Sequence, residues 1–297
     1  MTERELKKLY QHRDRVVRGI TTDGKFRVAV TLNTAIAQEA ARRHNAEPAA
    51  ALLLARALSG AALLSSFLKG EERIIVETMG NGVYKKIFAE ALQVGEVRGY
   101  VEKNRAPAML DDALGAGMMR VTKILYGKFE PVSGLVELRK GNITTDLAYY
   151  LTQSEQIPSA VRLDVRMDGD GAIQYSTGLL VQAMPGATDA EIMSVQNSII
   201  EVGDICELAA SGYGAEEIIK QVIPQDVEVL NNTPIDFYCR CSLDRFKSIL
   251  VSLGLAEVEN MHAAGHNELV CQYCNEHYTL SDNDFAELIT QLRAQQN

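Results

Sequence analysis

Hydrophobic and polar residues alternate one by one in two stretches of the chain, Phe26–Leu32 and Val161–Met167. A period of two places every second side chain on the same face of an extended segment, so each stretch predicts a half-buried strand. Shorter apolar runs predict further strands at Arg73–Met79, Val97–Val101, Met118–Ile124, Leu135–Leu138 and Gly178–Met184.

Two long segments, Thr34–Asn45 and Pro48–Lys69, are predicted to be helices. The apolar stretch Ala51–Leu68 contains Arg56 and barely reaches the ~18 residues of a membrane span, so we interpret it as a buried central helix and expect no membrane partner. Strands and helices that do not alternate regularly favour an α+β domain, with a mixed sheet and central helices, over a doubly wound sheet.

After Pro185 and Gly186 the pattern becomes helical. Thr188 and Glu191 have the spacing of a capping box, which predicts a helix that starts there and runs to about Ala210. Its apolar residues recur at intervals of three and four and form a seam that another surface must cover. The seam consists of Ile192, Val195, Ile199 and Val202, and continues through Cys206 and Ala209. A second short helix is expected at Ala215–Ile223.

The C-terminal part has two helix starts, at Ser242 for a helix to Leu253 and at Ser281 with Asp284 for a helix to about Ala294. Few large apolar residues lie between them, so this unit requires an additional source of stability such as a bound metal or disulfides. The sequence therefore predicts a core domain over 1–187, a helical linker over 188–232 and a small C-terminal domain over 233–297.

Four of the five cysteines lie in this last unit, as Cys239-Arg-Cys241 and Cys271-Gln-Tyr-Cys274. Two thiolate pairs on short turns can surround one Zn²⁺ ion tetrahedrally and leave no open position for water. We therefore predict one structural zinc site with these four cysteines as ligands. The alternative, four unconnected buried cysteines, does not account for the paired spacing.

The two pairs differ in how easily they can form a disulfide. Residues i and i+2 of an extended segment lie ~6.5–7 Å apart, at the limit for a disulfide, whereas a Cys-x-x-Cys turn brings its sulfurs together. We expect Cys271 and Cys274 to be oxidised before Cys239 and Cys241. Structural zinc contributes about 10–16 kcal/mol to folding in small metal domains, so oxidation is expected to unfold this unit and loosen the linker helix.

Other candidate residues have simpler explanations. Cys206 lies on the apolar seam and is expected to be a buried core thiol, with a redox role as the alternative. His262, His266 and His277 lie near the cysteine pairs, but four thiolates already complete a zinc shell. Gly80-Asn81-Gly82 and the Asp168–Gly171 segment lack the context of phosphate or calcium sites and are expected to be turns.

Charge and composition exclude several classes of function. From residue 189 onward there are 18 acidic and 5 basic residues, a net charge of −13, and so strongly acidic a tail disfavours a nucleic-acid partner. The N-terminal segment 1–19 is charged and lacks the apolar run of a secretion signal, so a cytoplasmic location is expected. No Ser-His-Asp arrangement can be argued, and we do not expect an enzyme.

The cysteine pairs, together with three segments elsewhere in the chain, resemble the family of the 33-kilodalton heat-shock chaperonin. The most specific segment is Asp146–Ser159, with its core Ser154-Glu155-Gln156-Ile157-Pro158-Ser159. The supporting segments are Gly95–Tyr100, Gly178–Gly186 and Phe237–Ser242. An N-terminal extension of about 12 residues and the segment Met261–Asn267 depart from the family pattern.

This resemblance implies a redox-regulated, ATP-independent chaperone that is inactive while reduced and zinc-bound. It further implies that oxidation forms Cys239–Cys241 and Cys271–Cys274 disulfides, releases zinc, unfolds the linker and allows binding of unfolding client proteins, usually by a homodimer. Two alternatives are a zinc-ribbon nucleic-acid binder, which the acidic tail disfavours, and a thiol-disulfide oxidoreductase. The latter requires a zinc-free Cys-x-x-Cys at the start of a helix, whereas Asn275–Leu280 is expected to be a strand.

Overall fold

The computed structural model describes residues 13–105 and 113–296 of the chain. The expected N-terminal extension of about 12 residues lies outside the described residues. The chain forms two compact units, and the boundary along the sequence lies between Tyr238 and Cys239. Each unit is described by itself below.

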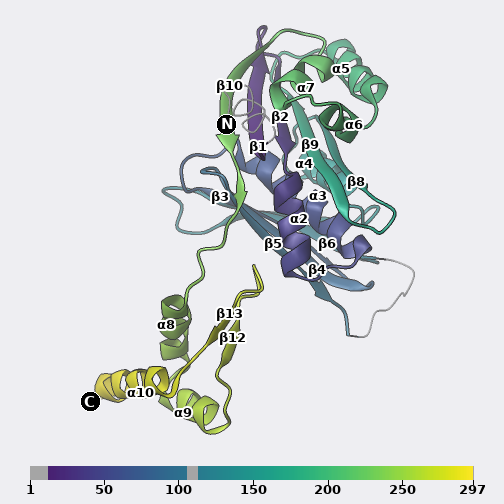
Figure 1. Cartoon of the computed structure of the whole chain (residues 1–297). Coiled ribbons are helices and arrows are strands. Elements are labelled where there is room, and N and C mark those ends of the chain that lie inside the picture. The colour runs from purple at the N-terminus through teal and green to yellow at the C-terminus, as the bar shows by residue number, and fades with distance from the viewer. Residues whose placement is uncertain (1–12, 106–112, 297) are drawn as a thin grey trace, which may run out of the picture. The chain divides into compact units, whose positions relative to one another are not determined.

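The first unit contains two β-sheets. Sheet A has five antiparallel strands in the order β10-β1-β2-β9-β8 (Figure 1). Its strands are β1 (Arg15–Thr21), β2 (Phe26–Leu32), β8 (Ser159–Met167), β9 (Ile173–Ala183) and β10 (Val227–Pro234). Two of its strands, the central β2 and the edge strand β8, are those that the alternating pattern predicts. The edge strand β10 comes from the region that we predicted to be the end of the linker and the start of the C-terminal domain.

Sheet B has six strands in the order β11-β5-β4-β3-β6-β7. They are β3 (Arg73–Gly80), β4 (Tyr84–Leu92), β5 (Glu96–Lys103), β6 (Gly117–Ile124), β7 (Val132–Glu137) and β11 (Asp236–Phe237). Neighbouring strands are antiparallel except for β11, which pairs in parallel with β5. The α+β class with a mixed sheet is therefore confirmed.

Helix α3 (Pro48–Ser65) is the centre of this unit. It contacts strands of both sheets, and α2 (Thr34–Arg43) and α4 (Thr144–Gln153) pack beside it. Among the described helices α3 alone is long and apolar enough to cross a membrane, and 78% of that window is buried inside the protein. The prediction of a buried central helix is confirmed. Because α3 is buried on all sides, its sequence is apolar around the whole helix.

Three short helices cover the other face of sheet A: α5 (Asp189–Val202), α6 (Ile205–Ala210) and α7 (Ala215–Val222). Val195 and Ile199 of α5 are buried against side chains of β2 and β9, and Ile192 and Val202 pack at the edge of the same cluster. The half-buried character predicted for β2 is therefore wrong. Its two faces are both covered, because α3 lies on one face and the linker helices lie on the other.

The predicted continuous helix from Thr188 to about Ala210 is interrupted. The capping box of Thr188 and Glu191 is present, but α5 ends at Val202. The next residue, Gly203, has a φ of 71°, a left-handed conformation that favours glycine. Asp204 then caps α6 by accepting a hydrogen bond from the Cys206 backbone N–H. The linker is therefore a chain of short helices, all within the first of the two compact units.

The second unit contains a small helical core and a hairpin. Its elements are α8 (Leu243–Leu253), α9 (Leu255–Ala263), β12 (Glu268–Val270), β13 (His277–Thr279) and α10 (Asp282–Gln296). The predicted caps are present at Ser242 and at Ser281 with Asp284, whereas α9 was not predicted. The buried residues of this core are Leu250, Val258, Leu280, Phe285, Leu288 and Leu292. Only Val258 and Leu280 of this core lie between the two predicted helices, which agrees with the expectation of few large apolar residues there.

Candidate metal centre

The four paired cysteines come together in the second unit. Cys239 and Cys241 lie on the non-helical segment that precedes α8, and Cys271 and Cys274 lie in the turn between β12 and β13. Their four Sγ atoms all lie within 4.8 Å of one another. The structure thus brings together all four residues that the spacing predicted as ligands.

The local backbone explains why the hairpin can present two sulfurs on one side. The backbone N–H of Cys271 donates to the Glu276 carbonyl at 2.9 Å, and that of Asn275 donates to the Cys271 carbonyl at 2.7 Å. Asn275 has a φ of 56°, a left-handed conformation that Asn tolerates better than most residues. The tight turn therefore places Cys271 and Cys274 next to each other.

The sulfur positions fit a tetrahedral ion. The Sγ atoms of Cys239 and Cys271 are 3.8 Å apart, and those of Cys241 and Cys274 are 3.3 Å apart. Four sulfurs at ~2.3 Å from one zinc ion would lie about 3.8 Å from one another. The site therefore has the size and donor set of a closed four-thiolate zinc centre.

A bound cation would change the protonation of the thiols. Cys271 and Cys274 are buried, with 4% and 2% of their surface exposed, and burial raises the pKa of both thiols. Four thiolates packed this closely repel one another unless a positive charge lies between them. A bound dication would supply that charge and hold all four cysteines deprotonated.

Tyr278 is a neighbour of the site that the sequence reasoning missed. Its hydroxyl oxygen is 3.2 Å from the Sγ of Cys241, and its ring packs on Phe246 with centroids 5.3 Å apart. Burial by itself would raise the pKa of Cys241, but hydrogen bonds from Tyr278 and the other cysteines lower it. Leu269 lies opposite Tyr278 in the hairpin of β12 and β13. A sequence prediction that assigned this register could have identified Tyr278 as a neighbour of the cysteines.

Two of the three histidines near the cysteine pairs contact carboxylates and not the sulfur cluster. The Nε2 atom of His262 is 3.0 Å from Asp282 Oδ1, and Nδ1 of His277 is 2.6 Å from Glu268 Oε1. His266 is exposed, and within the described part of the chain the four-sulfur cluster includes no histidine. These contacts support the interpretation that four thiolates alone complete the shell.

Cys206 lies in the other unit and is a buried core thiol, as its place on the seam predicted. Its Sγ is 3.2 Å from the Asp164 carbonyl oxygen and 3.4 Å from Thr177 Oγ1. Burial raises its pKa to about 12, which keeps it protonated at neutral pH. A protonated, buried thiol is a poor nucleophile.

The location of the Cys-x-x-Cys pair also bears on the oxidoreductase alternative. Cys271 and Cys274 lie in a hairpin turn and not at the first turn of a helix, where the helix dipole would stabilise a thiolate. The cysteines of this pair are also buried beside a second pair. The arrangement favours metal binding over thiol-disulfide exchange.

Comparison with known proteins agrees with the geometry. The family model described as Hsp33 protein matches residues 14–281. Relatives named 33 kDa chaperonin include that of Desulforamulus reducens, 34% identical over 94% of this chain and 98% of its own length. That of Geobacter sulfurreducens is 36% identical over 95% and 96%, respectively. The crystal structure of the 33 kDa chaperonin of Thermotoga maritima superposes with a TM-score of 0.85 at 29% identity, and covers 94% of this chain and 99% of that one.

Proposed function

This chain belongs to the Hsp33 protein family, and from that membership and its four-cysteine centre we propose that it is a redox-regulated, ATP-independent chaperone. Its relatives are named chaperonins. We propose that the reduced, zinc-bound protein is inactive, that it acts in the cytoplasm and that it is not an enzyme. Its partners would be unfolding client proteins, bound by a homodimer in the oxidised state.

The proposed chemistry uses hydrogen peroxide as the oxidant. Two thiolates of a pair give up two electrons to one peroxide molecule, the O–O bond breaks, a sulfur–sulfur bond forms, and two hydroxide ions are produced. The disulfides proposed are Cys271–Cys274 and Cys239–Cys241. With two of its four ligands consumed, the unit can no longer hold the ion, and it loses the ~10–16 kcal/mol that a structural zinc contributes.

The loss of zinc matters because the metal unit has a modest core of its own. Six buried apolar side chains form the core of residues 239–297, and a single core in so small a unit rarely supplies more than about 3–5 kcal/mol without a metal or disulfides. When the bound ion stabilises such a unit, its ligands should also control whether the unit is folded. Oxidation would therefore convert an ordered unit into a disordered one.

Chain connectivity offers a route from the metal centre to the linker. Strand β11 ends at Phe237, two residues before Cys239, and β10 ends at Pro234. β10 pairs with β1 at the edge of sheet A and follows directly after α7, whose residues share a core with α5. We propose that disorder which begins at Cys239 spreads through this edge strand and weakens the attachment of α5–α7.

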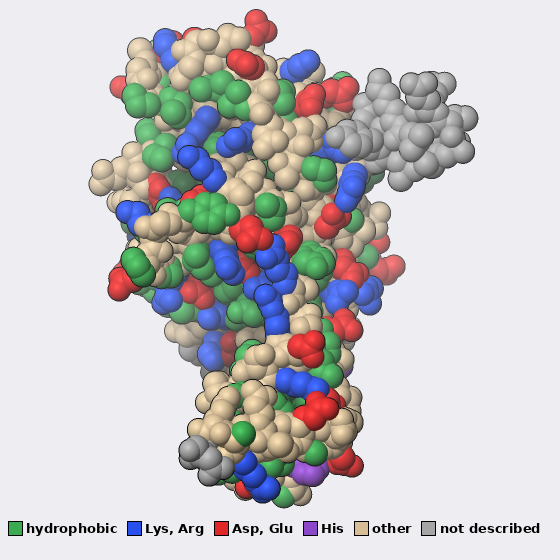
Figure 2. Space-filling model, turned by 90° about the vertical axis from the view of Figure 1, so that its left-hand side faces the viewer, with side chains coloured by type: hydrophobic (Ala, Val, Ile, Leu, Met, Phe, Trp, Pro, Cys, Tyr) green, Lys and Arg blue, Asp and Glu red, His purple; other side chains and the backbone are tan. Residues whose placement is uncertain are grey.

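The surface that the linker helices cover is suited to client binding. The cluster beneath them contains Val28, Leu179, Val181 and Phe26, which would become exposed when α5 leaves. On the face drawn in Figure 2, hydrophobic side chains lie in small groups among basic and acidic ones. Uncovering one face of sheet A would create a continuous apolar surface of the kind that binds unfolded chains.

The observation that carries this proposal is the cluster of four sulfurs within 4.8 Å of one another. Its test follows zinc content and aggregation of an unfolding client enzyme together, before and after peroxide treatment. We expect one zinc per reduced chain, no suppression of aggregation in that state, and both zinc loss and suppression after oxidation. Salt-dependent binding to DNA or RNA would favour the zinc-ribbon alternative, and catalysed disulfide exchange without zinc would favour the oxidoreductase.

A further inference from the structure

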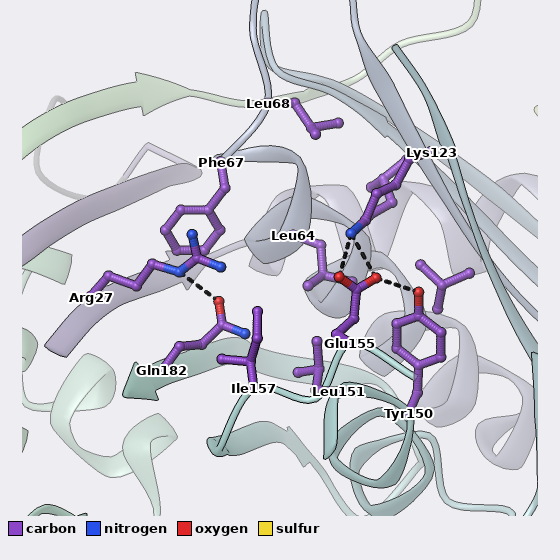
Figure 3. Close-up of a pocket in the computed structure, with 12 residues that line it drawn as sticks. Arg27, Leu64, Phe67, Leu68, Lys123, Tyr150, Leu151, Glu155, Ile157 and Gln182 are labelled. Carbon is purple, nitrogen blue, oxygen red and sulfur yellow. Dashed lines mark hydrogen bonds and ion pairs between the residues drawn. The ribbon is translucent and has the colours of Figure 1, made fainter. Parts of the chain in front are cut away.

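A cavity of about 170 Å³ lies inside the first unit, between its two sheets (Figure 3). It is formed where α3 ends at Ser65 and no longer fills the space between sheets A and B. Seven of its lining residues are apolar, among them Leu64, Ile74 and Ile157, and the others are polar or charged. An apolar cavity with a few convergent polar groups has the composition of a small-molecule site.

Arg27 lies at one end of this cavity. Arg27 lies on the inner face of β2, where it pairs with Gln182 of β9. Its Nε donates to Gln182 Oε1 at 2.8 Å. Its guanidinium carbon is 4.5 Å from the centroid of the Phe67 ring. Among the described residues no side chain or carbonyl accepts a hydrogen bond from either Nη atom, and no carboxylate forms an ion pair with Arg27.

The other end of the cavity is already neutralised. Nζ of Lys123 is 2.6 Å from both carboxylate oxygens of Glu155, and the Tyr150 hydroxyl donates to Glu155 Oε1 at 2.6 Å. Burial by itself would raise the pKa of Glu155, but these two hydrogen bonds lower it, so the carboxylate is ionised at neutral pH. Figure 3 shows Arg27 with Gln182 on one side and this triad on the other, with Leu64 and Ile157 between them.

The cavity therefore contains one unbalanced positive charge. Two cations, Lys123 and Arg27, face the single carboxylate of Glu155, so the net charge is +1. Arg27 is half-buried, and partial removal of water lowers the pKa of its guanidinium, whereas the charge of Glu155 raises it. A guanidinium held by stacking and by one amide presents its remaining N–H groups in the planar arrangement that matches a carboxylate. An anion at this position would gain a charge-assisted hydrogen bond without breaking an existing ion pair.

We propose that this cavity binds a small molecule or chain end that combines one carboxylate with a compact apolar group. The carboxylate would pair with the Nη atoms of Arg27, and the apolar group would lie against Leu64 and Ile157. The size is suitable, since a cavity of about 150 Å³ accommodates a benzene ring. This site is separate from the cysteines and does not depend on the proposed redox function.

Two sources can supply this chemistry. A free aromatic or branched-chain carboxylate would enter as a whole, whereas the C-terminal residue of a protein chain would insert its side chain and its α-carboxylate. Both place the same groups against Arg27. The probes are therefore 3-phenylpropionate for the first source and a tetrapeptide that ends in leucine for the second.

The test measures binding of each probe to the full-length, reduced and zinc-loaded protein by calorimetry and by NMR shifts of amides around the cavity. The control ligands are 3-phenylpropionamide and the same tetrapeptide with a C-terminal amide, which keep the shape and remove the charge. We expect at least one of the two carboxylates to bind about tenfold or more tightly than its amide, because hydrogen bonds to charged groups are the strong ones. The probe that binds identifies the source.

Variants locate the interaction. Arg27→Gln should reduce carboxylate binding about tenfold and leave the amide unaffected. Arg139→Gln is the matched control, because Arg139 also stacks on an aromatic ring, Tyr149 at 5.1 Å, outside the cavity. Ile157→Trp, which keeps Arg27 and fills the space beside it, should abolish binding of both kinds of ligand.

The comparison of acid with amide in the unmodified protein decides the outcome even if a variant does not fold. Equal affinity of a carboxylate and its amide would overturn the proposal, as would absence of binding by both carboxylates. Binding that Arg27→Gln leaves unchanged in a folded protein would place the anion elsewhere and would also overturn it.

Discussion

The Nζ atom of Lys25 lies 2.5 Å from Oε1 of Glu191, so the residue that completes the capping box of α5 also ties that helix to the start of β2. Glu191 therefore has two roles at the same helix end. The contact joins the proposed linker to sheet A through an ion pair, in addition to the apolar seam.

The pH dependence of this attachment follows from Glu191. Hydrogen bonds from Lys25 and then from Thr188 lower its pKa to about 2. A lowered pKa in the folded state stabilises the docked helix at pH above the ordinary value of about 4.5, and this contribution is lost as the pH falls toward 2. We expect amide protection of α5, corrected for intrinsic exchange, to decrease over this range before the core of sheet B is affected.

Glu191→Gln should decrease the amide protection of α5 at neutral pH. It should also remove most of the change in that protection between pH 5 and pH 3, a range that includes the ordinary pKa of about 4.5. Glu201→Gln is the matched control, because Glu201 is an exposed residue of the same helix. If both variants behave alike, the ion pair with Lys25 does not contribute to docking.

The seam of α5 is the proposed gate, and it can be tested with charges. Val195 and Ile199 are 2% and 5% exposed, so an aspartate at each position would be buried without a partner. We expect Val195→Asp with Ile199→Asp to undock the helix and to suppress client aggregation in reducing conditions without oxidant.

The control for this variant lies on the opposite face of the same helix. Met193 and Ile200 are 60% and 71% exposed, so Met193→Asp with Ile200→Asp adds the same charge without burying it. It should remain inactive until oxidised. A seam variant that is folded in sheet B, zinc-loaded and still inactive would show that the linker is not the gate.

The metal site can be tested by removing one ligand. Cys274→Ser should abolish tight zinc binding and leave residues 239–297 disordered, because zinc contributes ~10–16 kcal/mol, more than a core of this size supplies. Cys206→Ser makes the same chemical change in the first unit and should retain one zinc. Zinc analysis and amide exchange measure both results, and full zinc with full protection in Cys274→Ser would contradict the assignment of ligands.

The order of disulfide formation remains a prediction, and two effects oppose each other. Cys271 and Cys274 share a tight turn that favours closure, but both are buried, whereas Cys239 and Cys241 are half-buried and easier for peroxide to reach. We expect Cys271–Cys274 to form first, because exposure affects only the first attack and the geometry decides which pair can close. Mass spectrometry of a peroxide time course measures the order, and early appearance of Cys239–Cys241 would show that access dominates.

Several features of this protein are determined by local sequence. The spacing of the cysteines predicted all four members of the sulfur cluster, because short turns constrain where neighbouring thiols can point. The capping residues Thr188, Ser242 and Ser281 predicted where helices begin, since a cap satisfies backbone groups within the same turn. Strands with an alternating pattern, such as β8, were also predicted, because the period of two is a property of the segment itself.

Tertiary structure decided what depends on partners distant in the chain. The pairing of β10 with β1 joins residues about 200 positions apart, and no local pattern indicates it. β2 alternates as if the face of Arg27 and Ala29 were exposed, yet α3 and the cavity beside it lie on that face, while α5–α7, from a later part of the chain, cover the apolar face. The meeting of Arg27 with Phe67 and Gln182 likewise requires β2, the end of α3 and β9 to converge. Burial and long-range pairing are properties of the whole fold, so the cavity and the second face of sheet A were apparent only once the sheets were assembled.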